Sequence, residues 1–302
     1  MKVGVIGTGS MGKKHARVYS ELKGVEEVYA FDLNKDSVKS LKELDIIVCD
    51  SMKELLNNVD AVSICVPTKH HIEVAQKAIE NNVHCLIEKP IALCVNEAKN
   101  LVYSLKNIDL IVGIGQIERF NPIVNEIKKM IENPFYVEMK RHNPASSRIT
   151  DSSVIEDLMI HDIDIIFNIL FDEKNYGMHS AGNNNVCKAL FTFENSIVSI
   201  SASRKASKKI RSVYIEDDGF TIEGDFMTQE IYAYHKPDKY RIENDRYYQE
   251  NIIEKVLVNK VEPLKVELKT FMDCVKRNVE FPVTPEQALN NLMICEEIKK
   301  GL

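Results

Sequence analysis

The feature that most restricts the fold of this 302-residue chain is its first turn, where the apolar run KVGVI leads directly into Gly7, Gly9 and Gly12. The run has the composition of a buried strand, and residues 11 to 22 have the apolar spacing of a helix. Gly7 permits a tight turn, Gly9 lets another group approach the backbone, and Gly12 lets the helix pack on the strand. A mere strand-to-helix turn is the alternative reading, but a helix N-terminus of this kind also attracts a phosphate.

A carboxylate after the second predicted strand gives the glycine turn a more specific meaning. Asp32 ends the run EVYAFD, twenty residues after Gly12, at the position from which an acidic side chain binds ribose hydroxyls. Its negative charge would repel a 2′-phosphate, so NAD is the predicted cofactor. NADP is the less favoured alternative, because Lys35 would partly neutralise such a phosphate. Ser10 and Met11, at the helix N-terminus, are predicted to contact the cofactor.

Apolar runs alternate with helical stretches in the first part of the chain. Runs that are apolar throughout belong to a parallel sheet covered by helices on both faces. The second part carries alternating runs with turn signals, which indicate an antiparallel sheet. We predict an α/β protein in which residues 1–118 form an NAD-binding Rossmann domain with a doubly wound parallel sheet. Residues 119–302 are predicted to form a substrate-binding and oligomerisation α+β domain with an open, mainly antiparallel sheet, whose C-terminal helix is able to pack back on the first domain.

Composition argues against several other classes of protein. The net charge is −6 with acidic and basic residues interleaved, so nothing indicates nucleic-acid binding. No run of 18 apolar residues and no leader pattern occurs, so we expect a cytoplasmic protein without a membrane partner. The seven cysteines are scattered without a CxxC pair, which is typical of reduced thiols. No cluster has the spacing of metal ligands, so no metal is expected.

The segment VIEDLMIHDIDIIFNIL, residues 154–170, has the pattern of a buried helix except for one line of polar side chains. Four residues recur at the spacing of a single helix face, namely Asp157, His161, Asp164 and Asn168. The segment contains no lysine or arginine that would make this an ordinary solvated face. We therefore predict that the line borders a cleft. The alternative is a solvent-facing edge with a hydrogen-bonded histidine.

A lysine follows the fifth predicted strand, in the sequence HCLIEKP. The carboxyl ends of parallel strands form the edge at which open α/β sheets bind ligands, so Lys89 is predicted to lie at a ligand-binding edge. Pro90 keeps Lys89 out of the helical conformation and stiffens the turn. An ordinary solubilising lysine is the alternative.

Three stretches resemble the Gfo/Idh/MocA oxidoreductases in their order and spacing, and the similarity runs over essentially the whole chain: GVIGTGSMGKKHARVY, CVPTKHHIEVAQKAIENNVHCLIEKP and DLMIHDIDI. Members of that family oxidise or reduce carbinol carbons of sugars, inositols and nucleotide sugars with NAD(P), and commonly form homodimers or homotetramers through the open sheet. The resemblance implies three catalytic side chains, Lys89, Asp157 and His161, and a set that borders the dinucleotide, Pro67, Thr68, His71 and Glu88.

The resemblance also implies hydride transfer to NAD, assisted by an acid–base set. His161 suits the base that takes the hydroxyl proton, because histidine titrates near neutral pH. Asp157, one helical turn earlier, would hold the imidazole in the useful tautomer, and Lys89 would stabilise the developing alkoxide. Lysine and histidine are able to exchange these roles, and the sequence leaves that choice open.

Residues 117–123 and 140–165 resemble a shorter branch of the family, which is often linked to the oxidation of UDP-N-acetylglucosamine to its 3-keto form. Guanidinium groups bind phosphate bidentately, so three arginines in or near these stretches would suit the diphosphate: Arg119, Arg141 and Arg148. Ion pairing at the protein surface is the alternative for them. Three other functions stay open, namely an inositol or free-sugar dehydrogenase, a reductase of a non-sugar substrate, and a cofactor-sensing regulator without turnover.

Overall fold

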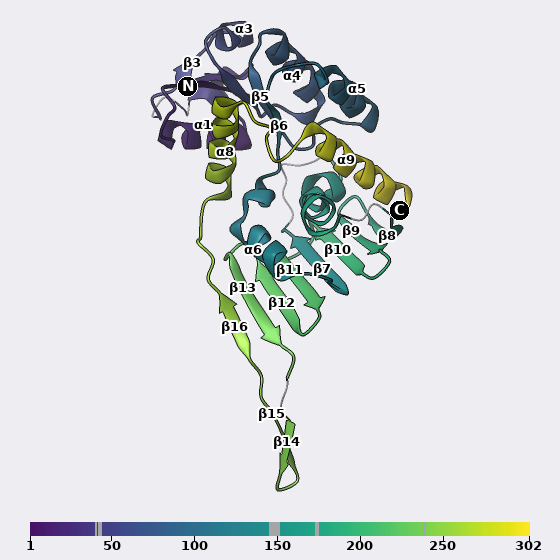
Figure 1. Ribbon diagram of the computed structural model, residues 1–302. Helices are drawn as coiled ribbons and strands as arrows, with labels where there is room; N and C mark the ends of the chain where they lie inside the picture. Colours follow the sequence, from purple (N-terminus) through teal and green to yellow (C-terminus); the bar gives the residue numbers. More distant parts are fainter. Residues whose placement is uncertain (40, 42–43, 145–151, 173–174, 238–239) are drawn as a thin grey trace. The chain divides into compact units, whose positions relative to one another are not determined.

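The computed structural model describes residues 1–39, 41, 44–144, 152–172, 175–237 and 240–302, and Figure 1 gives the order of their elements. The chain divides into two compact units, Met1–Phe120 with Glu262–Met293, and Asn121–Val261 with Ile294–Leu302. This division differs from the predicted boundary after residue 118 mainly in giving 262–293 to the first unit. The reason is helix α8 (Pro263–Arg277), whose Leu268 and Phe271 are buried in the core of the first unit.

The first unit is built on a six-stranded parallel sheet with the strand order β3-β2-β1-β4-β5-β6. The strands are β1 (Lys2–Ile6), β2 (Glu27–Phe31), β3 (Ile47–Val48), β4 (Ala61–Ile64), β5 (His84–Glu88) and β6 (Val112–Gly115). The helices of this part are α1 (Ser10–Glu21), α2 (Lys35–Lys39), α3 (Met52–Leu56), η2 (Thr68–His70), α4 (His71–Glu80), α5 (Val95–Leu105) and η3 (Ile117–Phe120). This order confirms the predicted doubly wound fold, and it brings the carboxyl ends of all six strands to one edge.

The second unit contains an eight-stranded sheet with the order β16-β13-β12-β11-β7-β10-β9-β8. Its strands are β7 (Tyr136–His142), β8 (Gly177–Asn183), β9 (Val186–Thr192), β10 (Ile197–Ser203), β11 (Ile210–Asp217), β12 (Phe220–Asp225), β13 (Glu230–His235) and β16 (Ile253–Val256). Strands β7 and β10 pair in parallel, and the other pairs of this sheet are antiparallel. The prediction of a mainly antiparallel sheet is confirmed.

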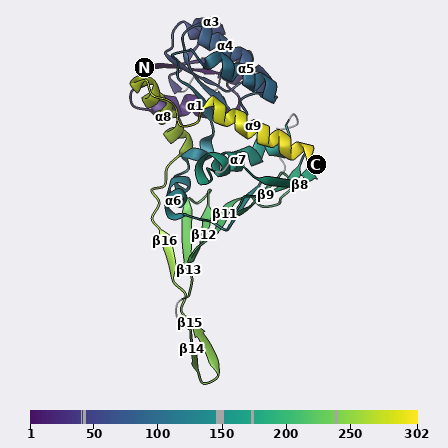
Figure 2. The same cartoon turned by 45° about the vertical axis from the view of Figure 1, so that its right-hand side comes forward.

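One face of this sheet carries the core of the second unit. Along β7 the side chains of Val137 and Met139 are buried, whereas Glu138 and Lys140 point to the other face. Helix α6 (Pro122–Met130) and the helical segment 155–170 cover the apolar face with residues such as Ile127. Figure 2 shows α7, the middle of that segment, lying along the sheet. The C-terminal helix α9 (Pro285–Lys300) contributes residues to both units.

The segment predicted as one regular helix changes its winding twice. It begins as a π-helix (η4, Ile155–Met159), continues as α7 (Ile160–Ile165) and ends as a second π-helix (η5, Ile166–Leu170). The amide of Phe171 accordingly donates to the carbonyl of Ile166, five residues earlier. The uniform spacing of 3.6 residues per turn is therefore wrong at both ends, and it holds only across α7.

Besides strand β16, two elements of the second unit were not predicted. The first is the edge strand β8, which is largely exposed and has few apolar residues. The second is a separate hairpin of β14 (Tyr240–Glu243) and β15 (Arg246–Gln249), joined by Asn244 and Asp245 at φ 50° and 59°. Such a pair of positive φ angles is typical of a two-residue hairpin turn. Within the described residues, the helices lack the length and apolar composition that a membrane crossing requires.

Candidate functional site

The glycine turn has the geometry that its spacing predicts. Gly7 adopts φ +89°, and a Cβ atom there would lie 2.7 Å from the backbone of Cys65. A Cβ on Gly12 would lie 1.8 Å from the carbonyl oxygen of Gly7, because helix α1 packs directly on the turn. A Cβ on Gly9, in contrast, would meet no atom within 4 Å. Two of the three glycines are therefore required by the fold itself, and the third leaves open space beside the backbone.

This open space lies at the N-terminus of α1. Gly9 is the N-cap of the helix and makes no side-chain capping bond, while Ser10 and Met11 form the first turn. Ser10 is exposed and Met11 is half-buried. The first backbone N–H groups of an α-helix have no partner within the helix and favour an anion. The residues of this turn therefore fit the phosphates of a dinucleotide.

Asp32 is held at the carboxyl end of β2 by backbone hydrogen bonds. The amide of Thr8 donates to its Oδ2 at 2.6 Å, and the amide of Asn34 donates to Oδ1 at 2.7 Å. Burial favours the neutral acid, but these bonds outweigh it and hold the pKa of Asp32 below its ordinary value. Lys35 forms an ion pair with Asp50, with Nζ 3.2 Å from Oδ1. The carboxylate beside the glycine turn is thus fixed and negative.

The predicted cofactor-bordering loop follows β4. Pro67 is exposed and Thr68 half-buried, and the short helix η2 begins at Thr68. His71, at the start of α4, is only 1% exposed. Its Nδ1 lies 2.8 Å from the carbonyl oxygen of Pro90, and its Nε2 lies 2.9 Å from that of Val66. Burial lowers the pKa of His71. Because a neutral imidazole carries one N–H, the ring donates to one of these two carbonyl oxygens at a time.

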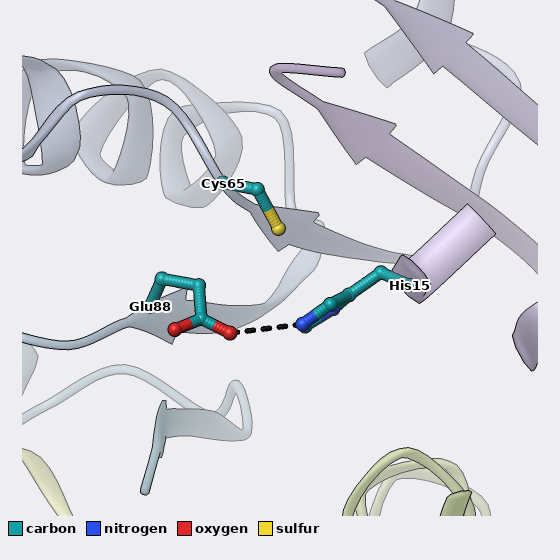
Figure 3. Close-up of side chains that lie close together, drawn as sticks. All are labelled: His15, Cys65 and Glu88. Atoms are coloured by element: carbon teal, nitrogen blue, oxygen red, sulfur yellow. Dashed lines mark hydrogen bonds and ion pairs between the residues drawn. The ribbon is translucent and has the colours of Figure 1, made fainter. Parts of the chain in front are cut away.

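Lys89 follows the last residue of β5, at the carboxyl end of the strand as predicted, and is half-buried. Its neighbour Glu88 is 8% exposed and accepts a hydrogen bond of 2.8 Å at Oε1 from Nε2 of His15, which is fully buried on α1. Burial opposes the charge of Glu88, but the bond from His15 holds the pKa of that carboxyl below its ordinary value. Figure 3 shows this pair with the thiol of Cys65 pointing toward it.

His15, Cys65 and Glu88 are the one group of possible metal ligands in the described part of the chain, with donor atoms within 4.8 Å of one another. Ligand atoms around a tetrahedral zinc lie closer, at about 3.5 Å, since metal–ligand distances are about 2.0–2.3 Å. Burial, helped by the charge of Glu88, raises the pKa of the Cys65 thiol well above its ordinary value. A protonated thiol is a poor ligand, so the three residues form a hydrogen-bonded pair with a thiol beside it.

In the second unit, the expected catalytic carboxylate has a cationic partner that the sequence did not reveal. Oδ2 of Asp157 lies 3.4 Å from Nε of Arg204, which follows the end of β10. Nη2 of Arg204 also donates to the carbonyl oxygens of Ser152 and Ser153, at 2.7 and 2.8 Å. Arg204 therefore ties the start of the π-helical segment to the sheet and faces Asp157 with a positive charge.

The other residues of the polar line are mostly buried. His161 is 8% exposed and Asp164 only 1% exposed, so the solvent-facing alternative is wrong for this part of the line. Asn168 donates to Oδ1 of Asp164 at 3.1 Å. The three expected catalytic residues are distributed over two units, with Lys89 in the first and Asp157 and His161 in the second.

The structure corrects the expectation for two of the substrate arginines. Arg141 is 1% exposed and donates from Nε and Nη2 to Oδ1 of Asp162, at 3.0 and 2.6 Å. Arg119 is 6% exposed and donates from Nη1 to the carbonyl of Pro282 and to Gln287, both at 2.7 Å. Arg141 is thus held by a buried carboxylate, and Arg119 by a backbone carbonyl and an amide side chain. Both arginines are buried, so the alternative of surface ion pairs is also wrong for them. Arg148 lies outside the described residues.

Sequence reasoning did not single out His15 or Arg204. His15 lies three residues after Gly12, on the buried face of α1 together with Ala16 and Tyr19, and a histidine on such a face was a usable signal. Arg204 follows strand β10, and the apolar pattern of that strand does not indicate which helical segment Arg204 contacts. Only the packing of β10 against residues 152–157 brings it to Asp157.

Comparison with known proteins assigns the chain to a family. Residues 1–116 match the model of the Gfo/Idh/MocA oxidoreductase family, described as an NAD-binding Rossmann fold. A UDP-N-acetylglucosamine 3-dehydrogenase of Acidithiobacillus ferrooxidans is 32% identical over 244 residues, which cover 78% of this chain and 77% of that protein. This chain belongs to the Gfo/Idh/MocA oxidoreductase family. It is thus a member of a family of NAD(P)-binding oxidoreductases.

Two further similarities describe its place within the Gfo/Idh/MocA family. A solved structure of the UDP-N-acetylglucosamine 3-dehydrogenase from A. ferrooxidans matches all of this chain and 97% of that one, with a TM-score of 0.88 and 28% identity. An inositol 2-dehydrogenase/D-chiro-inositol 3-dehydrogenase of Halalkalibacterium halodurans is 27% identical, but this match spans only 57% of this chain and 53% of that protein. The family is therefore established, and the sugar is a separate question.

Proposed function

We propose that this protein oxidises a secondary hydroxyl of a nucleotide sugar with NAD, and that UDP-N-acetylglucosamine, converted to its 3-keto form, is the first candidate substrate. The main support is that the glycine turn, Asp32 and Lys89 follow strands β1, β2 and β5 of one parallel sheet. Ligands bind at this edge of open α/β sheets. The similarity to a UDP-N-acetylglucosamine 3-dehydrogenase supports the choice of sugar.

The proposed preference for NAD over NADP rests on Asp32 and its surroundings. The carboxylate is fixed by two backbone bonds and carries a negative charge where the adenosine ribose binds in this fold. Lys35, the nearby cation, is engaged by Asp50. A 2′-phosphate would therefore meet uncompensated negative charge.

In the proposed reaction, three side chains have separate roles, and bound NAD supplies the hydride acceptor. Lys89 hydrogen-bonds the reacting oxygen and stabilises the negative charge that develops there. His161 takes the hydroxyl proton, and Asp157 stabilises the imidazolium that forms. Arg204, beside Asp157, holds that carboxylate in place. Lys89 and His161 are both chemically able to be the immediate proton acceptor.

The test is NADH formation from NAD across a panel of UDP-sugars, free sugars and inositols. Turnover is expected with UDP-N-acetylglucosamine, and Lys89→Ala is expected to lower kcat by about 10²- to 10⁴-fold. Lys99→Ala, which removes an exposed lysine of α5, serves as the matched control and is expected to leave kcat unchanged.

The inositol dehydrogenases of the family provide the second candidate function, favoured by the similarity reported above. Turnover of myo-inositol and none of any UDP-sugar would establish that alternative. Binding of NAD without turnover of any panel member would instead indicate a cofactor-sensing regulator.

For the assembly, we propose a homodimer or homotetramer formed through the eight-stranded sheet. The sheet face opposite the helices carries a hollow of about 510 Å³, lined by residues such as Glu138, Lys140, Tyr214 and Tyr232. Light scattering is expected to give two or four chain masses. A charge reversal at Lys140 (Lys140→Glu) is expected to shift the mass toward that of one chain, and a wild-type monomer would refute the assignment.

A further inference from the structure

Two buried histidines each contact a residue that flanks Lys89. On one side, Nε2 of His15 donates to Oε1 of Glu88 at 2.8 Å. On the other side, Nδ1 of His71 lies 2.8 Å from the carbonyl oxygen of Pro90. The histidines are 0% and 1% exposed, so both contacts are shielded from water. The residues on either side of Lys89 are thus each held by a histidine from another segment of the first unit.

The first contact joins the glycine turn to the lysine. His15 lies on α1, three residues after Gly12, and Glu88 is the last residue of β5. Because a Cβ on Gly12 would collide with the turn, α1 has no room to move toward β1. The bond from His15 therefore connects a rigid helix to the strand end that precedes Lys89. Figure 3 shows the ring of His15 reaching the carboxylate from this helix.

The second contact joins the lysine to the loop after β4. His71 begins α4, and its other ring nitrogen lies 2.9 Å from the carbonyl oxygen of Val66. One ring thus spans two backbone segments, the Lys89–Pro90 turn and the loop before η2. A buried carbonyl that loses its donor costs about 1–3 kcal/mol, so this ring specifies one position for the turn.

We propose that His15 and His71 are positioning residues that present Lys89 for reaction by holding Glu88 and Pro90. A lysine side chain has four flexible carbons, so the position of its ammonium group depends on how firmly its backbone is held. A misplacement of about 1 Å by a distant change is able to cost about 10²-fold in rate. This inference rests on the proposed function of Lys89.

The structure allows matched substitutions that keep or remove one bond at a time. A glutamine amide reaches about as far as Nε2 of histidine, and an asparagine amide about as far as Nδ1. His15→Gln therefore keeps a donor toward Glu88, and His15→Asn removes it. At residue 71 the order is reversed for the tautomer in which Nδ1 donates to Pro90, since His71→Asn keeps that donor and His71→Gln places a donor toward Val66 instead.

The expected result is a crossed pattern, in which glutamine preserves kcat at residue 15 and asparagine preserves kcat at residue 71. His15→Asn and His71→Gln are expected to lower kcat by about tenfold to 10²-fold, with KM and NAD affinity within about twofold of wild type. His15→Gln and His71→Asn are expected to keep most of kcat. A role limited to filling buried space would lower stability in all four variants without this crossing. Glu88→Asp, which shortens the acceptor and keeps its charge, replaces His15→Asn if that variant does not fold.

A second readout does not depend on sugar turnover. The rate at which an amine reagent modifies Lys89 in the NAD complex is followed by mass spectrometry of the peptide that contains it. The crossed pattern is expected here as well, with rates altered in His15→Asn and His71→Gln and close to wild type in the other two. If the wild type turns over no sugar, the proposed function fails, while the labelling still decides this inference. Equal labelling rates or equal losses of kcat in all four variants would overturn it.

Discussion

Nε of Arg204 lies 3.4 Å from Oδ2 of Asp157, and both side chains are largely buried, with 9% and 15% of their surfaces exposed. The same guanidinium donates to the carbonyl oxygens of Ser152 and Ser153. Arg204 thus fixes both the start of the π-helical segment and the carboxylate proposed to assist His161.

Replacing Arg204 with glutamine is therefore expected to destabilise the protein and to impair catalysis. The buried carboxylate of Asp157 would lose its cationic partner, which is expected to cost about 3–5 kcal/mol in the free energy of unfolding. Urea denaturation measures this loss. Arg204→Lys keeps the charge with fewer donors and is the control, expected to lose less. An Arg204→Gln protein as stable as wild type would show that the ion pair contributes nothing.

The glycine turn provides a pair of substitutions with opposite outcomes. Gly12→Ala places a Cβ 1.8 Å from the carbonyl oxygen of Gly7, so it is expected to lower stability by about 3 kcal/mol or more. Gly9→Ala meets no atom, so it is expected to leave stability unchanged and to weaken NAD binding by about tenfold or more. Thermal denaturation and NAD titration separate the two effects. Unaltered NAD affinity in Gly9→Ala would mean that the phosphates do not bind beside this residue.

These glycines also show what local sequence is able to specify. The strand, turn and helix around Gly7, Gly9 and Gly12 lie within twelve residues, so their spacing predicts their geometry. Apolar runs likewise predicted the strands of the first sheet, because buried parallel strands carry a strong local signal.

Local sequence patterns do not predict contacts between segments that are far apart in the chain. The sequence predicted that Arg141 binds phosphate. In the structure, β7 packs against α7, and this packing joins Arg141 to Asp162. The π-helical turns at both ends of 155–170 also depend on packing, since a periodic pattern assumes one winding throughout. Asn244 and Asp245 are a different case, since asparagine and aspartate both tolerate positive φ and an adjacent pair of them is itself a local turn signal.

Cofactor preference is expected to follow the charge of Asp32. Asp32→Asn removes the negative charge and keeps one oxygen acceptor, so it retains one of the two bonds that the amides of Thr8 and Asn34 make to separate oxygens of Asp32. The preference for NAD over NADP is expected to fall by about tenfold or more in this variant, measured as the ratio of kcat/KM for the two cofactors. Wild-type enzyme that prefers NADP would contradict the role given to Asp32.

The buried pair of Arg141 and Asp162 is expected to serve stability alone. Arg141→Met and Asp162→Ala each leave a buried charge without its partner, so each is expected to cost about 3–5 kcal/mol in the free energy of unfolding. The double variant is expected to cost less than the sum of the two. KM for the sugar in folded Asp162→Ala protein is expected to stay within about twofold of wild type. A large rise in KM with little change in stability would restore the substrate role for Arg141.

Stability is expected to decrease as the pH falls below the ordinary histidine pKa of 6.5, because burial lowers the pKa of His71 and also those of His84 and His142. Below pH 6.5 the unfolded chain binds more protons at these residues than the folded chain, so acid favours unfolding. Chemical denaturation at about pH 7.5 and about pH 5.5 measures the effect. His71→Asn removes one titrating group and is expected to show a smaller decrease. Stability that rises toward about pH 5.5 would contradict this sign.

The central claim is tested most directly by the initial rate of NADH formation from UDP-N-acetylglucosamine and NAD, with wild-type protein and Lys89→Ala compared at the same bound NAD. Turnover by the wild type and a loss of about 10²-fold or more in kcat for the variant are expected. NAD binding without NADH formation from any sugar or inositol, or an undiminished kcat in Lys89→Ala, would contradict it.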